Sequence, residues 1–471
     1  MQDYPLNLDA SLRVGLRPDS RRAVGSPGLV RCKNARPTPG GLEGITPVVQ
    51  PWVGSVTWPF PQVIRGFNAV WLADESSIHR LADDWTLEPA VSYVTPGLAW
   101  SAASHGSYII LTNGAVTARI APETDDLAVV NDSATNLYDS TIPLSTHISE
   151  FKGRLVASGI QNPNGSRYGS DEAWIAISKP GSADFTIDAS NLSFWRPMPS
   201  GGSVRGSLRL VDVVMVYADD SVYALRPADA SSGLWELRRI AENGLLCPTA
   251  FCGDVRRHIW IDADGWLWSI DAAMNVKRLG YRDYFLPIRN ANPRISYNAS
   301  KREFYICTDS VGYVLTESGL GEITQMFTSG YAEAGSWIAP VLDLGDRELL
   351  VVNDTITGPD GASASISWIA VSGDGLTGAQ AGGYWSAGGD VFAPRPWAPL
   401  DVNGNAFVPL AGARLRPAVR IPSPDGENTR ITGFSARRKS GDRRFARGPS
   451  AIPSGVSSRF LTTPEANGGD A

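Results

Sequence analysis

Cysteine and histidine are scarce in this sequence. The 471 residues include four of each, and no two histidines have the spacing of metal ligands. A structural zinc site needs four such ligands. Cys247 and Cys252 lie five apart without a second pair, so we expect reduced thiols and no disulfide framework. These scarcities exclude a disulfide-rich scaffold, and we expect no metal and no cofactor.

Catalytic motifs are also missing. There is no G-x-S-x-G nucleophile elbow and no G-x-x-x-x-G-K-[ST] phosphate loop. Adjacent acids occur at 83–84, 125–126 and 219–220, but Asp pairs at hairpin tips usually cap the turn. A glycosidase needs two carboxylates facing each other across a cleft, and that arrangement stays an alternative. The sequence predicts a protein that is not an enzyme.

Long hydrophobic runs are absent too. No stretch approaches the roughly 18 apolar residues of a membrane span. The first residues, "MQDYPLNLDASLRVG", lack a basic region followed by an apolar one. We expect no membrane span, no secretory signal and synthesis in a reducing cytoplasm.

Turn-forming and aromatic residues are abundant. The chain has 48 Gly, 33 Pro, 15 Trp, 14 Tyr and 14 Phe. Such a composition is typical of many short strands joined by tight turns. It predicts an all-β protein with few helices.

Short apolar strands recur in pairs around acidic or Gly-containing turns. These hairpins centre near residues 75, 113, 219, 264 and 310. The intervals are about 40 to 50 residues, apart from one gap of about 100 that has room for another unit. Units of this size cannot bury an apolar face alone, so the rhythm predicts a β-propeller of five to seven blades.

The stretch "WIDADGWLWSI", residues 260–270, has three tryptophans around an Asp-Gly turn. A calcium loop of the D-x-D-x-D-G type would need an acid where Trp260 stands. Aromatic packing between blades is the favoured interpretation. A carbohydrate-stacking surface is the alternative, with Trp195 and Trp235 as further candidates.

Four segments are expected from changes in pattern and composition. Residues 1–50 form an extended N-terminal arm, and 51–330 form the propeller. Residues 331–450 form a C-terminal β-sandwich-like domain, because longer strands there lack the hairpin rhythm. Residues 451–471 form a flexible tail rich in Pro, Ser and Gly.

Charge is distributed unevenly. Residues 411–447 contain nine Arg and one Lys against three acids, a net of +7, which leaves −13 for the rest of a chain whose total is −6. Residues 436–448 of this segment indicate a contact surface for a neighbouring subunit or for phosphates, with a solvated loop as the remaining alternative. The subunit contact is preferred, and its candidate residues are Arg437, Arg438, Arg443, Arg444 and Arg447.

The first fifty residues carry a family resemblance. Along the chain stand Gly15-Leu16, then Pro18-Asp19, a basic pair, Pro27-Gly28, Asn34-Ala35 and Gly41-Leu42-Glu43. This order resembles the opening of tail nozzle and tail hub proteins of short-tailed bacteriophages, although Leu16-Arg17 replaces the family's Gln pair. The segments "FKGRLVASGI", "AWIAISKPGSADF" and "SGGSVRGSLRLVDVVMVYADDSVYALRP" resemble later passages of the same family.

The resemblance implies a structural virion protein assembled in the host bacterial cytoplasm. Such proteins form a hexameric ring below the portal and its adaptor, extend the DNA channel and help retain and release the genome. An acidic body suits a channel through which DNA slides without sequence-specific binding. Pro18, Asp19 and Asn34 are expected in an arm that contacts a neighbour. The alternatives are a glycan- or receptor-binding propeller of a tail fibre or cell surface, and a propeller glycosidase.

Overall fold

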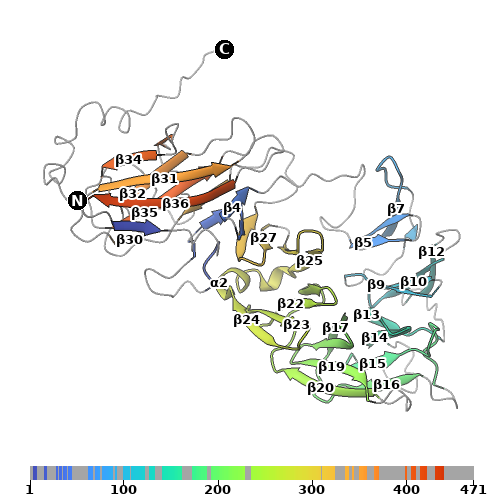
Figure 1. Cartoon of the computed structure of the whole chain (residues 1–471). Helices are drawn as coiled ribbons and strands as arrows, with labels where there is room; N and C mark the ends of the chain where they lie inside the picture. Colours follow the sequence, from blue (N-terminus) through green and yellow to red (C-terminus); the bar gives the residue numbers. More distant parts are fainter. Residues whose placement is uncertain are drawn as a thin grey trace. The chain divides into compact units, whose positions relative to one another are not determined.

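The expected hairpins form the body of the computed structural model (Figure 1). Between 62 and 323 the structure describes all residues except 67–68, 75–76, 89–90, 93–98, 107, 122–126, 133–140, 162–171, 188–192, 229–234 and 309. Before 62 it describes 4–7, 15–18, 28–29, 31–33, 35–39 and 41–44, and after 323 only the backbone of the strands given below. Two compact units result: residues 50–299, and residues 1–49 together with 300–471.

Sheets of four antiparallel strands follow one another along residues 62–280. Blade 1 is β5 (Gln62–Arg65), β6 (Val70–Ala73), β7 (Ser77–Leu81) and β8 (Val91–Ser92). Blade 2 is β9 (Ser101–His105), β10 (Tyr108–Thr112), β11 (Val116–Ile120) and β12 (Leu127–Asp132). Blade 3 is β13 (Leu144–Phe151), β14 (Arg154–Gln161), β15 (Trp174–Ile177) and β16 (Phe194–Pro197).

Blade 4 is β17 (Val204–Leu210), β18 (Val213–Ala218), β19 (Val222–Pro227) and β20 (Trp235–Ala241). Blade 5 is β21 (Phe251–Gly253), β22 (Arg257–Ile261), β23 (Leu267–Asp271) and β24 (Val276–Gly280). Blade 6 is β25 (Arg294–Asn298), β26 (Glu303–Cys307), β27 (Gly312–Leu315) and β28 (Leu320–Ile323). The fold is therefore a six-bladed β-propeller, within the expected range, and blade 3 fills the gap of about 100 residues.

The apolar core lies between successive blades. One buried cluster joins Trp71 and Ile78 of blade 1 to Ile109 and Leu111 of blade 2. Other clusters join blade 2 to blade 3 and blade 3 to blade 4. Second strands such as β10, β14 and β18 are therefore buried on both faces, which is why their sequences are continuous apolar runs.

Helical structure is minor, as expected. The described residues contain one α-helical turn, α2 (Arg282–Phe285), and one 3-10 turn, η1 (Arg289–Ala291). Both follow β24 and precede β25, so they form the connection from blade 5 to blade 6.

Further strands belong to the unit of residues 1–49 and 300–471. Those of the arm are β1 (Tyr4–Asn7), β2 (Arg31–Lys33), β3 (Ala35–Thr38) and β4 (Gly41–Gly44). The later ones are β29 (Gly335–Ile338), β30 (Leu342–Asp343), β31 (Leu349–Thr357), β32 (Ser365–Ala370), β33 (Ala398–Pro399), β34 (Asn405–Pro409), β35 (Arg414–Ile421) and β36 (Arg430–Lys439).

These later strands divide between two hydrogen-bonded sheets. One contains β31, β34 and β36, and the other contains β29, β30, β32, β33 and β35. Most of residues 331–450 and all of the expected tail, 451–471, lie outside the described residues. The sandwich-like domain and the domain boundaries stay predictions.

Candidate functional site

A cavity of about 490 Å³ lies among the first strands of the blades. First strands of a propeller blade face the central axis, so this is an axial cavity. Its polar and charged lining comes from Gln62, Ser101, Ser104, Thr146, His147, Ser149, Glu150, Arg209, Thr249, Cys252 and Arg294. The cavity brings polar and charged side chains from several blades to one concave surface, and it is the candidate for a binding site.

Several hydroxyl groups of the lining already bond between blades. Ser101 donates to the Ile148 carbonyl oxygen (2.8 Å) and accepts the Ile148 N–H (3.1 Å). The hydroxyls of Ser149 and Ser207 share a hydrogen bond of 3.0 Å between blades 3 and 4. These groups stabilise the contacts between blades and are not arranged as nucleophiles beside a base.

His147 stands on β13 in the wall of the cavity. Its Nδ1 accepts the Ser207 backbone N–H (3.3 Å), and its ring lies 5.3 Å from that of Phe251. Burial lowers the pKa of His147 to about 3, because a charged imidazolium is poorly solvated there. The side chain is therefore neutral at neutral pH and too weak a base to activate a nucleophile efficiently.

Among the described residues, the charged groups that line the cavity are two arginines and one carboxylate. Glu150 lies 3.7 Å from Arg209, and its Oε1 accepts the Gly153 N–H at 2.8 Å. Arg294 contributes the second guanidinium. The described part of the lining thus holds one carboxylate, whereas a glycosidase needs two.

Two of the three tryptophans of 260–270, Trp260 and Trp268, pack against other aromatic rings of the fold. Trp260 is fully buried, and its ring centroid lies 5.7 Å from that of Tyr217 in blade 4. The Trp268 ring stacks on Trp260, with 6.1 Å between the ring centroids. Asp262 accepts the Trp268 indole N–H (2.7 Å) and the Trp266 backbone N–H (2.9 Å). Packing between blades is confirmed for Trp260. No group of three or more His, Cys, Asp or Glu able to hold a metal occurs among the described residues.

The adjacent acids that the structure describes lie in turns and accept hydrogen bonds there. Asp84 accepts both the backbone N–H and the hydroxyl of Thr86 (3.0 and 2.6 Å), and these bonds lower its pKa. Asp220 accepts the hydroxyls of Ser221 (2.6 Å) and Ser200 (3.0 Å). The pair at 125–126 lies outside the described residues. Asp84 caps its turn, as the sequence indicates, whereas Asp220 binds the side-chain hydroxyls of Ser200 and Ser221.

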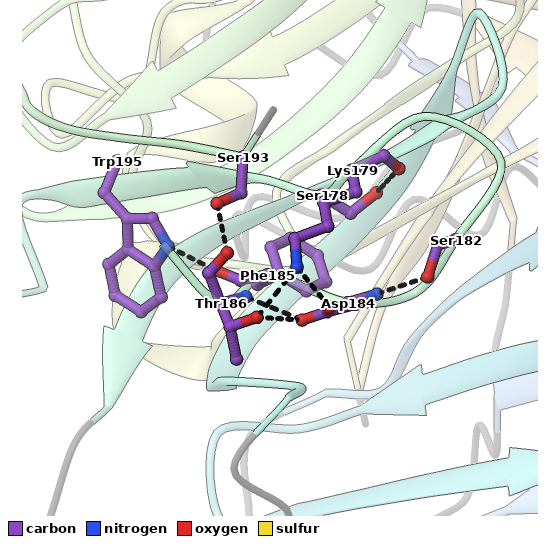
Figure 2. A network of polar contacts seen from close by, with 8 residues as sticks. All are labelled: Ser178, Lys179, Ser182, Asp184, Phe185, Thr186, Ser193 and Trp195. Carbon is purple, nitrogen blue, oxygen red and sulfur yellow. Dashed lines mark hydrogen bonds and ion pairs between the residues drawn. The ribbon is translucent and has the colours of Figure 1, made fainter. Parts of the chain in front are cut away.

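The loop between β15 and β16 is held by its own side chains (Figure 2). Asp184 binds the Lys179 ammonium (2.7 Å) and accepts from the hydroxyl and N–H of Thr186 (2.6 and 2.8 Å). Phe185, 1% exposed, points into the core between blades 2 and 3, and its carbonyl accepts the Trp195 indole N–H at 2.8 Å.

The two tryptophans considered for glycan stacking are therefore engaged in the fold. Trp195 is half-buried against the cluster that contains Phe185. Trp235 is 7% exposed and contacts Phe151 edge-on at 6.0 Å. Trp235 therefore does not line an open groove, because Phe151 of blade 3 covers it. Trp195 is only half-buried, and the glycan-binding alternative stays a prediction.

The N-terminal arm packs onto blade 6 within the second unit. The Leu16 N–H donates to the Leu320 carbonyl oxygen (2.7 Å), and Leu16 and Leu29 are 1% and 0% exposed. Gly15 has φ +66°, and a Cβ there would lie 2.3 Å from the same carbonyl oxygen. Farther along, β2 pairs in parallel with β28 and antiparallel with β29.

A buried ion pair fastens the arm at a second point. Arg36 lies 3.2 Å from Glu303 of β26, with side chains 9% and 7% exposed. The Tyr305 hydroxyl donates to the same carboxylate (3.0 Å), and the Thr316 hydroxyl donates to the Pro37 carbonyl oxygen (2.7 Å). The arm is thus an integral part of blade 6, a contact that residue spacing did not indicate.

The expected contact residues are only partly described. Pro18 is half-buried in the arm, whereas Asp19 and Asn34 lie outside the described residues. Arg437 and Arg438 lie on β36, opposite Val351 and Leu350 of β31. The remaining arginines, Arg443, Arg444 and Arg447, lie outside the described residues.

None of the cavity residues was predicted from the sequence as part of a binding site. His147 and Arg209 stand on first strands whose neighbours are ordinary strand residues. The available signal was positional, since first strands of the repeating units must face the axis. Using this signal would have required knowing the residue at which every blade begins.

No protein-family model and no curated protein matches the sequence. Among solved structures it is similar to PorZ, a surface component of the type-IX secretion system of Porphyromonas gingivalis (9% identity, 61% of this chain, 36% of that chain, TM-score 0.34). It is also similar to the Pan2 WD40 domain of Neurospora crassa (7%, 59% and 86%, 0.35) and to a functionally unknown protein of Desulfotomaculum acetoxidans (10%, 59% and 87%, 0.37).

At these identities and TM-scores, the similarity carries no functional argument. The chain spans about a third of the PorZ chain that it matches. No helix in the described part of the chain has the length and apolar character of a membrane span.

Proposed function

We propose that this chain is a structural virion protein, the tail nozzle or hub subunit of a short-tailed bacteriophage. It assembles into a hexameric ring in the host bacterial cytoplasm and joins the portal-adaptor and other tail proteins. The ring extends the DNA channel and helps retain and release the genome. The subunit itself catalyses no reaction.

The observation that carries this proposal is the fastening of the arm. The elements that resemble the phage family include Gly15-Leu16 and Gly28, and these residues meet in space. The Arg17 N–H donates to the Leu29 carbonyl oxygen (3.2 Å), and the Leu29 N–H donates to the Gly15 carbonyl oxygen. Gly15, Leu16 and Gly28 therefore lie in one folded contact with blade 6, which supports the family resemblance.

The chemistry of the propeller also supports a structural role. The axial wall uses its Ser hydroxyls to join blades, and its histidine is held neutral by burial. Outside the basic segment the chain carries a net −13. Phosphates bind poorly to a surface of like charge, as DNA passage requires. The glycan-binding alternative loses the support of Trp235, which is buried against Phe151.

Sedimentation velocity of the full chain tests the proposal. We expect a hexamer whose population increases with protein concentration, for the chain alone or mixed with the portal-adaptor. Arg437→Glu with Arg438→Glu should shift the population toward monomer, because charge reversal opposes a contact with carboxylates. Arg238→Glu, on the exposed part of β20, is the matched control. A chain that stays monomeric at high concentration, with and without the adaptor, contradicts the proposal.

A further inference from the structure

Residues 275–299 form a second basic stretch of this acidic chain. They run from β24 through α2 to β25 and contain five basic side chains and one acid, a net of +4. Together with the +7 of residues 411–447, they leave −17 for the rest of a chain whose total is −6. A positive surface on so acidic a protein attracts the acidic surfaces of other copies.

Two arginines of this stretch are held on one tryptophan of blade 5. The Arg278 guanidinium lies 4.5 Å over the centroid of the Trp266 ring, and that of Arg282 lies 5.7 Å from the same centroid. Contact with an indole face orients a guanidinium without occupying its N–H groups. Arg278 is exposed, and its side chain has no hydrogen bond or ion pair among the described residues. We call Arg278, Arg282 and Trp266 the arginine clamp.

The backbone under the arginine clamp is packed closely. Gly265 has φ +78°, and a Cβ there would lie 2.7 Å from the backbone nitrogen of Leu286, so the turn before β23 packs directly on α2. Arg282 joins the same two elements by donating from Nε to the Asp264 carbonyl oxygen (3.0 Å). The Asp262 carboxylate of this turn is 3% exposed and accepts from an indole N–H within the blade, so it does not neutralise the clamp.

Two simpler uses do not account for the arginine clamp. β24 is the outer strand of blade 5, and Lys or Arg on an outer strand discourages pairing with another chain. That protection needs neither an indole under Arg278 nor a second arginine on α2. Asp264, Asp271 and Asp283 are exposed within the same region, and they would repel the continuous phosphate backbone of a nucleic acid. The clamp therefore fits separate carboxylates on a protein surface.

A turn of opposite charge lies in blade 1, between β7 and β8. We call residues 82–86 the acidic turn, because Asp83 and Asp84 are exposed there beside Trp85, which is 51% exposed. Trp85 has φ +65°, a conformation that bulky side chains rarely adopt. Its N–H donates to the Ala82 carbonyl oxygen and the Ala82 N–H donates to the Thr86 carbonyl oxygen (both 2.9 Å), which holds the turn in this conformation. Backbone strain thus keeps an indole exposed beside two carboxylates.

We propose that the arginine clamp of one copy binds the acidic turn of a second copy of this chain. The inference rests on the ring proposed above and names one contact within it. The clamp and the turn lie on different blades, so the contact is heterologous, and a repeated heterologous contact generates a ring when its rotation closes. Trp and Arg side chains are enriched at such contacts, and their opposite charges set the orientation of the two copies.

Sedimentation velocity of the full chain tests the contact by charge exchange. Arg278→Glu and Asp83→Lys should each weaken self-association about tenfold, because each places like charges opposite one another. The double variant restores opposite charges and should recover most of the loss. Arg256→Glu replaces an exposed arginine in the turn between β21 and β22 of the same blade, and this matched control should assemble like the wild type.

Trp85→Gly distinguishes a contact residue from a residue that the fold requires. Glycine adopts a positive φ without strain, and this relief offsets the extra freedom of the unfolded chain, so the midpoint of urea denaturation should change little. Self-association should nevertheless weaken about tenfold, because an aromatic anchor of the contact is lost. Unchanged self-association of Trp85→Gly would overturn the proposed contact.

The remaining outcomes separate this contact from the ring itself. A wild type that stays monomeric overturns both. If the wild type assembles and the charge-exchanged double variant assembles no better than the single variants, the ring stands and this contact is overturned. Fluorescence anisotropy with a labelled DNA duplex covers the other partner class. Loss of duplex binding in Arg278→Glu with intact assembly would assign the clamp to phosphates and overturn the contact as well.

Discussion

Gly206 has no side chain at the point where Phe251 of the next blade enters. A Cβ at Gly206 would lie 2.3 Å from Cζ of Phe251 and 2.5 Å from Cε1. The Phe251 ring packs on Tyr217 at 4.9 Å and on His147 at 5.3 Å, so it has little room to move. Because Gly206 has only a hydrogen atom in place of a side chain, Phe251 can make the aromatic contact between blades 4 and 5.

Gly206→Ala should lower the free energy of unfolding by about 1–3 kcal/mol, because the added methyl group overfills a packed contact. Urea denaturation followed by tryptophan fluorescence measures the change. Adding Phe251→Leu to the same chain should recover part of the loss, since the smaller side chain makes room. Equal stability of Gly206→Ala and the wild type would contradict this account.

His258 illustrates a different requirement at the same contact. It is 0% exposed, its Nε2–H donates to the Arg209 carbonyl oxygen (2.9 Å), and its Nδ1 accepts from the Tyr217 hydroxyl (2.9 Å). Burial lowers the pKa of His258 to about 4, below the usual 6.5. As the pH falls, the unfolded chain therefore binds a proton before the folded chain does.

Stability should be lost as the pH falls from about 6.5 to about 4, with His258 contributing about 3 kcal/mol to that loss. Urea titrations at several pH values measure it. His258→Asn should be less stable at neutral pH but lose less stability on acidification. His79→Asn, in the surface hairpin of blade 1, controls for removing an imidazole. An unchanged pH dependence in His258→Asn would refute the assignment.

At the scale of elements, the hairpins follow from the sequence because their determinants are local. Asp219-Asp220 turn between β18 and β19, as expected from the acidic turn between two apolar runs. Asn113-Gly114 also turn, but only Gly114 has a positive φ (+86°). Asn113 instead accepts the N–H groups of Ala115 and Val116 with its side chain (3.0 and 2.7 Å). The position was predictable and the turn geometry was not.

The arm could not be placed from the sequence because its contacts are distant along the chain. Arg36 meets Glu303 across 267 residues, and no local pattern specifies such a partner. Cys32 is fully buried beside the same strands, which raises the pKa of its thiol well above the usual range. The expectation of buried reduced thiols holds there, since Cys32 is free.

Arg36→Ala should lower the free energy of unfolding by about 3–5 kcal/mol, because it leaves the Glu303 carboxylate buried without its cation. Arg36→Leu combined with Glu303→Leu should cost much less, since neither charge then remains buried. Chemical denaturation of the single and double variants gives both values. If the double variant were as unstable as Arg36→Ala, the ion pair would not be what fastens the arm.

At the scale of the molecule, the rhythm of turns predicted a propeller because each blade needs the next to bury its apolar face. The spacing of the hairpin turns predicted the repeating blades, and the composition predicted the all-β class. Residues of the axial cavity could not be predicted, because His147 and Arg209 are distinguished only by the strand on which they stand. The role of Arg437 and Arg438 stays a prediction, since what contacts them depends on other subunits.

Electron cryomicroscopy of the full-length protein with its portal-adaptor, averaged without imposed symmetry, shows whether the ring exists. We expect a sixfold ring of propeller subunits around an open axial channel. Single propellers with no ring at any concentration would contradict it.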